Sequence, residues 1–275
     1  MTSPAAQAAQ AEHHEHEPSP RLARLVERAV GYRIAGYPAG VHVGMPSGTV
    51  TLVLPLDAPL TVTDGGSGPT AYGSVLAGLS TAPAHIHHDG NQHGVQLALR
   101  PGAVRALFGV RAAEVAGGSY ELVDVMGPAA TTLRERLHET DSWTTRFALV
   151  EQVLLDLECG RRARDEPAPE VAEAWRLIRA SGGAAPIREV AARVGWSMRR
   201  LQTQFGAEFG VTPQALARVR RFERSLPLVL AADVSLADVA ARCGWSDHAH
   251  MDRDWRELAG TSPTRWRTDD VLIGA

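Results

Sequence analysis

The pattern of hydrophobic and polar positions changes character along the chain. Between residues 31 and 100, short apolar and β-branched runs alternate with glycine, proline and asparagine, which is typical of strands separated by turns. The runs that predict strands are Thr49–Leu56, Leu60–Thr63, Ser74–Leu79 and Gly94–Leu99. Several short strands at this spacing indicate a sandwich or an open barrel.

A helical period replaces this pattern on both sides of the strands. Pro20–Val30 reads as a short amphipathic helix, and further helices are predicted over Pro101–Phe108, Pro128–Glu139 and Thr144–Arg164. Gly160–Pro169 is charged, contains prolines and has no period, which predicts a linker. The sequence after this linker has a helical period throughout.

These patterns predict an α+β protein in three segments. The first, residues 1–19, is rich in alanine, glutamine, histidine and glutamate, and is predicted to be a disordered arm. Residues 20–166 would form a β-rich sensor or dimerisation domain with flanking helices. Residues 167–275 would form an all-α domain.

The helical segment contains an internal repeat. Ile187–Ser197 ends in Val-Ala-Ala-Arg-Val-Gly-Trp-Ser, and Leu236–Ser246 ends in Val-Ala-Ala-Arg-Cys-Gly-Trp-Ser. Each copy has an apolar helix face, then a glycine where a left-handed backbone is cheap, then a serine that can cap the next helix. This order predicts two helix-turn-helix units, at about 187–206 and 236–256.

Helical spacing separates the inward from the outward residues of these units. The predicted core holds the turn glycines, the close-packing alanines and the bulky apolar residues, namely Ala191, Gly195, Trp196, Leu201, Phe205, Ala240, Gly244, Trp245, Met251 and Trp255. A helix over Pro213–Ala231 would join the units, with a bend or a helix end near Leu226 because Pro227 removes a backbone hydrogen bond.

The segment from about Pro169 to Arg267 resembles the DNA-binding domain of the AraC/XylS family of bacterial transcription regulators. Both repeats carry the resemblance, above all Gly-Trp-Ser-Asp-His-Ala-His-Met in the second. Trp245 and Trp255 stand where the family has Phe or Tyr, and Met251 where it has Phe or Leu. Pro46-Ser-Gly-Thr and Phe108-Gly-Val resemble uncharacterised N-terminal domains that are joined to such modules.

The resemblance implies a sequence-specific regulator whose partner is double-stranded DNA. Its two recognition helices would read successive major-groove segments, with base contacts from Arg199, Gln202, Thr203, His248, Asp252 and Arg253. Residues expected to contact phosphate or to position the protein are Ser197, Arg200, Ser246, Arg220 and Arg267. Asp252 would have to accept from cytosine or orient Arg253, and Asp254 is also placed near the groove. The second unit is therefore expected to read fewer bases than the first.

The charge and the cysteine content add little to this prediction of function. The formal net charge is −3, but residues 168–267 hold more arginines than carboxylates, which favours a basic C-terminal module. Cys159 and Cys243 lie far apart and predict no disulfide framework, so a cytoplasmic location is expected. No apolar run approaches the length of a membrane span, so no membrane partner is expected.

An enzyme or metal sensor is the alternative interpretation. His85 and His87 alternate on one predicted strand, which suits a metal in a cupin-like domain fused to the DNA-binding module. Asn91 or Gln92 stands where a carboxylate ligand is expected, so a polar hairpin is favoured. No nucleophile constellation or phosphate-binding loop is present, and we expect neither a cofactor nor an enzyme. The histidines of the arm, His13, His14 and His16, are expected to bind metal only adventitiously.

The N-terminal domain is expected to regulate the C-terminal one. A small-molecule effector, a homodimer and a contact with RNA polymerase are possible partners, and a pure dimerisation domain is a further alternative. The helical segment Pro128–Arg164 is the expected dimer contact or coupler between the domains.

Overall fold

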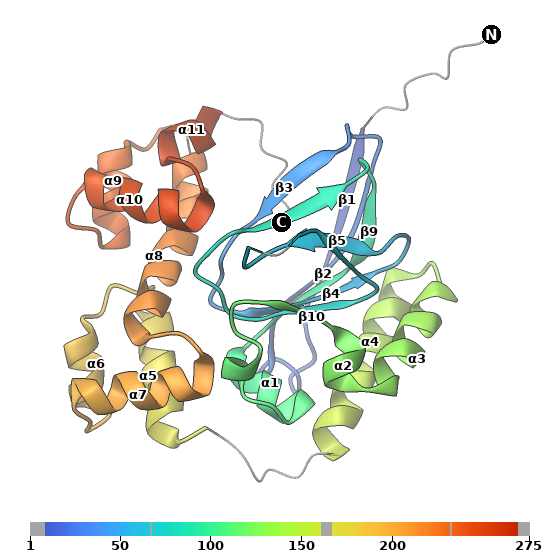
Figure 1. Ribbon diagram of the computed structural model, residues 1–275, viewed down its shortest axis with the longest axis horizontal. Coiled ribbons are helices and arrows are strands. Elements are labelled where there is room, and N and C mark those ends of the chain that lie inside the picture. Colours follow the sequence, from blue (N-terminus) through green and yellow to red (C-terminus); the bar gives the residue numbers. More distant parts are fainter. Residues whose placement is uncertain (1–8, 67, 161–166, 232, 269–275) are drawn as a thin grey trace.

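The computed structural model describes residues 9–66, 68–160, 167–231 and 233–268. A β-rich N-terminal part is followed by a helical C-terminal part, which confirms the predicted α+β class (Figure 1). The predicted linker falls largely on residues 161–166, outside the described residues.

Two antiparallel sheets form the N-terminal domain. The six-stranded sheet has the order β1-β2-β9-β4-β7-β10 and the four-stranded sheet the order β3-β8-β5-β6. The strands are β1 (Gln10–His16), β2 (Val26–Ala35), β3 (Gly40–Gly44), β4 (Val50–Pro55), β5 (Leu60–Thr63), β6 (Thr70–Tyr72), β7 (Val75–Ala77), β8 (Ala84–His88), β9 (Gln92–Leu99) and β10 (Ser119–Glu121). Four of them, β4, β5, β7 and β9, confirm the strands predicted from the apolar runs.

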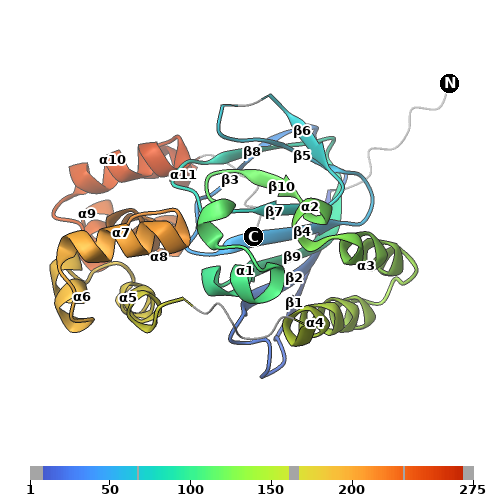
Figure 2. The same ribbon diagram turned by 60° about the horizontal axis from the view of Figure 1, so that its bottom comes forward.

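Helices cover the outer face of the six-stranded sheet. They are α1 (Pro101–Phe108), α2 (Leu122–Met126), α3 (Pro128–His138) and α4 (Trp143–Gly160), with a 3-10 turn, η1 (Ala112–Glu114), after α1. Figure 2 shows α1, α3 and α4 on the side of this sheet that faces away from the four-stranded sheet. Trp143 packs so closely on β2 that a Cβ at Gly31 would overlap its ring. The three predicted helices of this region are confirmed as far as Gly160.

Two predictions near the N-terminus were wrong. Pro20–Val30 is not a helix, because residues 20–25 form a turn and β2 begins at Val26. Within the supposed disordered arm, Gln10–His16 is β1, paired with β2 along its whole length. Residues 1–8 lie outside the described residues.

The arm histidines are held by α4. The His14 ring stacks on Trp143 with centroids 5.0 Å apart, and His16 stacks on Phe147 at 4.5 Å. His16 Nε2 also lies 3.1 Å from Glu151 Oε1. A polar strand forms here because the sheet edge supplies backbone partners and α4 supplies packing, neither of which is visible in the local sequence.

Seven helices form the C-terminal domain in the described residues. They are α5 (Pro169–Ala180), α6 (Ile187–Arg193), α7 (Met198–Phe209), α8 (Pro213–Leu230), α9 (Leu236–Cys243), α10 (His248–Ala259) and α11 (Pro263–Thr268). Helices α6–α7 and α9–α10 are the two predicted helix-turn-helix units, and α8 joins them (Figure 1). No helix of the described segments is both long and apolar enough to cross a membrane.

The predicted linker helix is confirmed as α8, but the alternative that it ends near Leu226 was wrong. Helix α8 continues through Pro227 to Leu230, where the Ala231 N–H donates to the Pro227 carbonyl at 3.2 Å. Val229 is fully buried in the core of the second unit. This packing holds the last helical turn although proline removes one of its hydrogen bonds.

Candidate nucleic-acid interface

The first helix-turn-helix unit has the local geometry that its sequence predicts. Ala191 is buried on α6, and Gly195 adopts a left-handed conformation with φ 71°. The Ser197 hydroxyl caps α7 by accepting the Arg200 N–H at 3.2 Å. Leu201 and Phe205 of α7 are fully buried. The turn and the core therefore orient the opposite face of α7 toward solvent.

That outward face carries the predicted base-reading residues of the first unit. Arg199, Gln202 and Thr203 are all exposed on α7. The Thr203 hydroxyl donates to the Arg199 carbonyl of its own helix at 3.0 Å. The two long side chains, Arg199 and Gln202, are thus the ones that can extend toward a ligand.

Trp196, predicted as a core residue, packs against the core cluster only in part. Its ring is only partly buried, and the Arg200 guanidinium lies over it, 4.5 Å from the ring centroid. The cation–π contact holds Arg200 beside the start of α7. Arg200 is itself exposed, so its predicted phosphate contact stays open to test.

The second unit caps its recognition helix differently. Gly244 again adopts a left-handed conformation, with φ 89°. Asp247 caps α10 by accepting the His250 N–H at 2.7 Å, and this hydrogen bond lowers the pKa of the Asp247 carboxyl. The Ser246 hydroxyl is 3.1 Å from Asp247 Oδ2 and also 3.1 Å from His250 Nδ1. Ser246 therefore supports the capping carboxylate.

The predicted base-reading residues of α10 differ in their surroundings. His248 and Arg253 are exposed. Asp252 forms an ion pair with Arg256 one turn later at 2.5 Å. Asp252 is thus held by Arg256, and the prediction that it orients Arg253 is not supported by this geometry.

Asp254 does not face the groove, contrary to the prediction. It is buried, with 5% of its surface exposed, together with Met251, Trp255 and Leu258. These four residues have the i, i+3, i+4, i+7 spacing of a single helix face. The period alone would have placed Asp254 inward, but its charge suggested otherwise.

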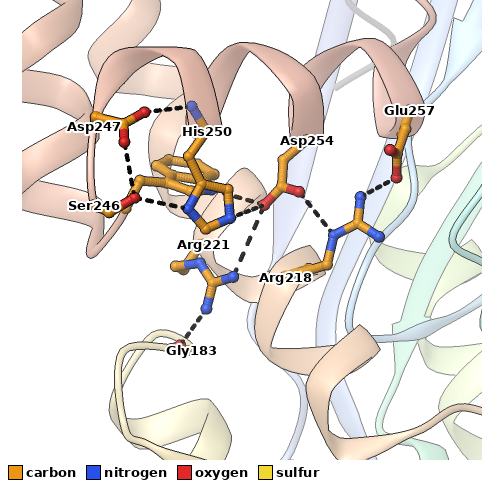
Figure 3. A network of polar contacts seen from close by, with 9 residues as sticks. Gly183, Arg218, Arg221, Ser246, Asp247, His250, Asp254 and Glu257 are labelled. Carbon is orange, nitrogen blue, oxygen red and sulfur yellow. Dashed lines mark hydrogen bonds and ion pairs between the residues drawn. The ribbon is translucent and has the colours of Figure 1, made fainter.

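Two arginines of α8 and a tryptophan of the turn before α10 surround Asp254 (Figure 3). Its carboxylate accepts from the Trp245 indole N–H at 2.7 Å and from Arg218 Nε at 2.9 Å. Arg221 lies 3.8 Å away and also donates to the Gly183 carbonyl at 3.0 Å. Burial lowers the pKa of Arg221. Buried charges need such paired and hydrogen-bonded surroundings.

Arg220 faces the N-terminal domain, so its predicted phosphate contact is not supported. Its guanidinium pairs with Glu223 at 2.8 Å. The side chain packs against Gly48, where an added Cβ would lie 2.7 Å from Arg220 Cδ. The periodicity of α8 could not reveal this, because Gly48 is far away in the sequence.

Arg267 likewise has an internal role where a phosphate contact was predicted. Its guanidinium donates to the backbone carbonyls of Val229 at 2.7 Å and Val234 at 2.8 Å. These carbonyls lie at the end of α8 and just after it. Arg267 thus fastens α11 to the segment that connects α8 with α9.

The histidines of the alternative metal-site interpretation, His85 and His87, lie on β8. His87 Nε2 is 2.9 Å from the Thr63 hydroxyl, and His85 is exposed. Among the described residues, no group of three or more histidine, cysteine, aspartate or glutamate side chains could hold a metal ion. On the neighbouring strand, burial and the nearby His88 lower the pKa of His42 to about 4.

Polar contacts at three places in the described residues join the two domains, and sequence reasoning missed all three. Arg105 of α1 forms two hydrogen bonds with Glu208 of α7, at 2.6 and 3.2 Å. The Gly48 N–H donates to Glu223 of α8 at 3.0 Å, and burial raises the pKa of that carboxyl. Glu27 of β2 pairs with Arg179 of α5 at 3.1 Å. None of these contacts comes from Pro128–Arg164, the segment predicted as coupler.

Comparisons with known proteins agree with the two-part architecture. Residues 169–269 match the family model described as a helix-turn-helix domain. Residues 14–121 match a family described as a domain of unknown function (DUF6597). The transcriptional activator NphR of Rhodococcus sp is 34% identical over 89 residues, which are 32% of this chain and 26% of the relative. The activator RhaS of Klebsiella pneumoniae is 35% identical over 75 residues, 27% of each chain.

The chain thus spans about a quarter of the length of the curated relatives it matches. A solved structure of apo ToxT from Vibrio cholerae shares the fold over 95% of this chain and 97% of its own, with a TM-score of 0.51 at 9% identity. The matched relatives are transcription regulators, and none of these findings supports the enzyme alternative. Residues 169–269 form a double helix-turn-helix DNA-binding domain of the AraC type.

Proposed function

We propose that the protein is a sequence-specific transcription regulator that reads two successive major-groove segments with α7 and α10. The observation that carries this proposal is the pairing of two helix-turn-helix units, each with an exposed polar face on its second helix. The linker helix α8 has 18 residues, so it is about 27 Å long. That length is close to the pitch of about 34 Å that separates successive major-groove segments on one side of B-DNA.

The two units would contribute unequally. In α7, Arg199 and Gln202 are exposed, and they have the chemistry to bind guanine and adenine bidentately. In α10, Asp252 is paired with Arg256, which leaves His248 and Arg253 as the exposed candidates. The first unit therefore supplies most of the base readout, and the second mainly positions the protein.

A gel-shift assay on the protein's own promoter region tests the proposal. Binding should be specific, and it should weaken as salt rises, because phosphate contacts release counterions. Specific binding should persist when competitor DNA of random sequence is added. If the affinity does not depend on DNA sequence at either of two salt concentrations, the proposal of a sequence-specific regulator is contradicted.

Replacing Arg199 by alanine should remove discrimination at one or two base pairs. The expected cost is about 1–3 kcal/mol on the cognate site and little on random DNA, because one bidentate base contact is lost. Arg200→Ala is the matched variant on the same helix. It should lower the affinity for all DNA sequences alike, as expected for the loss of a phosphate contact. Competition titrations with single-base variants of the site measure both, and equal profiles for the two variants would contradict the assignment.

We also propose that the N-terminal domain binds a small-molecule effector between its two sheets. A cavity of about 160 Å³ lies there, lined by residues of β4, β5, β7 and β8 such as Thr51, Val62, Val75 and Ile86. Its size is close to that of a cavity of about 150 Å³ that holds benzene in another protein. Met45, Pro46, Ser47 and Thr49 line the cavity. The N–H of Gly48, which lies between Ser47 and Thr49, donates to Glu223 of α8. Occupancy of the cavity can thus act on the linker helix.

The lining favours a small uncharged ligand. The described residues that line the cavity include no arginine, lysine or histidine, while Asp64 contributes a carboxylate. An anionic ligand would lose its hydration there without gaining a cationic partner, which is costly. The apolar side chains that dominate the lining are suited to a single ring or a short aliphatic molecule.

Benzene should therefore stabilise the protein, and benzoate at the same concentration should not. Ligand at ten times its Kd stabilises by about 1.4 kcal/mol, which corresponds to a rise in Tm of roughly 3–5 °C for a chain of this size. Ala77→Phe fills the cavity from β7 and should abolish the rise, whereas Ala71→Phe on exposed β6 should preserve it. Differential scanning fluorimetry measures all four cases. A larger shift with benzoate than with benzene would contradict the proposed ligand class.

A homodimer and a contact with RNA polymerase were expected from the sequence, and we keep both as proposals. Sedimentation of the full chain with and without DNA tests the first. The segment Pro128–Arg164 stays the proposed dimer contact. Its proposed coupling role is weakened, because the polar contacts between the domains come from α1, β2 and the loop containing Gly48.

A further inference from the structure

The two helix-turn-helix units differ at one corresponding position of their recognition helices. Gln204 of α7 and Asp254 of α10 each precede the aromatic core residue of their helix, Phe205 and Trp255. Gln204 is exposed, whereas Asp254 is buried. Only the second unit thus buries a carboxylate at this position. Packing within a single helix does not explain why a charged residue is placed there.

Asp254 links its recognition helix to the linker helix. Arg218 of α8 donates to Asp254 at 2.9 Å and to Glu257, also on α10, at 2.5 Å. Burial lowers the pKa of Arg218, but the carboxylates of Glu257 and Asp254 outweigh it and raise the pKa overall. Because the fork of Arg218 engages two carboxylates of α10, it restrains the rotation of α10 about α8 as well as the distance between them.

A second arginine extends the link to the first unit. Arg221 of α8 lies 3.8 Å from Asp254 and over the Trp245 ring, 5.9 Å from its centroid. The same guanidinium donates to the carbonyl of Gly183, in the turn between α5 and α6 (Figure 3). One group of side chains thus spans from the second recognition helix through α8 to the turn that leads into the first unit.

We propose that Asp254 is a positioning residue that sets the spacing between the two DNA segments that the protein recognises. The inference rests on the proposed DNA-binding function. Successive major-groove segments on one face of DNA lie about 10–10.5 base pairs apart, so only units held at one separation and angle fit one spacing. The Asp254 contacts hold that arrangement, although the carboxylate itself touches no base.

Asp254→Asn tests the proposal in the full-length protein. The variant keeps the side-chain shape but removes the charge that attracts Arg218 and Arg221. Asp238→Asn is the matched control, since Asp238 lies on α9 of the same unit, is exposed, and accepts a hydrogen bond at 2.7 Å from Ser235 at the start of its own helix. The DNA panel contains the site selected by the wild-type protein from a random pool, the same site with one or two base pairs inserted between its halves, and each half alone.

The readout is the ratio of affinity for the selected site to affinity for the spaced sites. We expect a ratio of at least tenfold for the wild type and for Asp238→Asn, and about threefold or less for Asp254→Asn. Affinity for the isolated halves should change by no more than about twofold. A purely structural role would lower all affinities together and leave the ratio unchanged, and that result would overturn the proposal.

A second variant covers the case in which Asp254→Asn does not fold. Arg221→Gln removes the link to Gly183 while leaving the hydrogen bonds of Asp254 with Trp245 and Arg218. It should lower the spacing ratio in the same direction, and a wild-type ratio in this folded variant would overturn the proposal. A wild-type protein that selects no sequence would instead contradict the proposed function itself, so the two failures are distinguishable.

Discussion

Trp255→Ala should lower the free energy of unfolding of the C-terminal domain by about 3–5 kcal/mol, the range for removing a fully buried large aromatic side chain. Trp255 has no exposed surface. Its ring meets Phe222 edge-on at 4.9 Å and Trp266 at 6.1 Å, so one truncation removes two aromatic contacts. Its indole N–H donates to the Ser225 hydroxyl at 3.0 Å, and that buried hydroxyl would lose its donor.

Chemical denaturation followed by circular dichroism measures the loss. Trp196→Ala is the matched control, since it truncates a tryptophan that is only partly buried, in the turn of the first unit. The control should cost clearly less than Trp255→Ala. Equal losses would show that the second core does not depend on Trp255 in the way its burial and contacts indicate.

Gly183→Ala, in the turn that leads into the first unit, should destabilise the protein more than replacement of Gly195, the turn glycine of the unit itself. Gly183 has φ 78°, and an added Cβ would overlap the backbone carbonyl of Ala217 on α8. A left-handed conformation costs an L-residue roughly 1–2 kcal/mol, and forced overpacking typically adds about 1–3 kcal/mol. The turn between α5 and α6 would have to move away from α8, which also strains the hydrogen bond from Arg221 to the Gly183 carbonyl.

Gly195→Ala separates the cost of the left-handed backbone conformation from the cost of overpacking against α8. Gly195 has a similar φ of 71°, but its Cβ would meet nothing within 4 Å. This control should therefore cost only the conformational part, roughly 1–2 kcal/mol. Thermal unfolding of both variants gives the comparison. If the two variants lose the same stability, the close approach of α8 to Gly183 is not what constrains this turn.

Local signals in the sequence were sufficient where a unit is built from its own residues. The repeated Val-Ala-Ala-Arg segment with its Gly-Trp-Ser turn predicted both helix-turn-helix units, because helix faces, glycine turns and caps depend on neighbours within a few residues. The outward position of Arg199 and Gln202 follows from the same spacing. The role of these side chains at a DNA site remains a prediction.

Local signals were insufficient where a distant partner decides the state of a segment. Gln10–His16 is polar and would be unordered alone, but it forms a strand because β2 pairs with it and α4 covers it. The turn at residues 20–25 likewise replaces a predicted amphipathic helix, since Val26 enters the six-stranded sheet. In both cases the tertiary partner outweighs local propensity.

The sequence by itself therefore determined that two helix-turn-helix units exist and where their turns lie. Only the tertiary structure decided how charged residues are used. Arg220 and Arg267 looked available for phosphate, but they bind Glu223 and two backbone carbonyls. Asp254 looked outward-facing, but it joins α10 to α8. The reason is physical: an apolar side chain is directed inward by helical period, whereas a charge is buried only where the fold brings its partner from elsewhere in the chain.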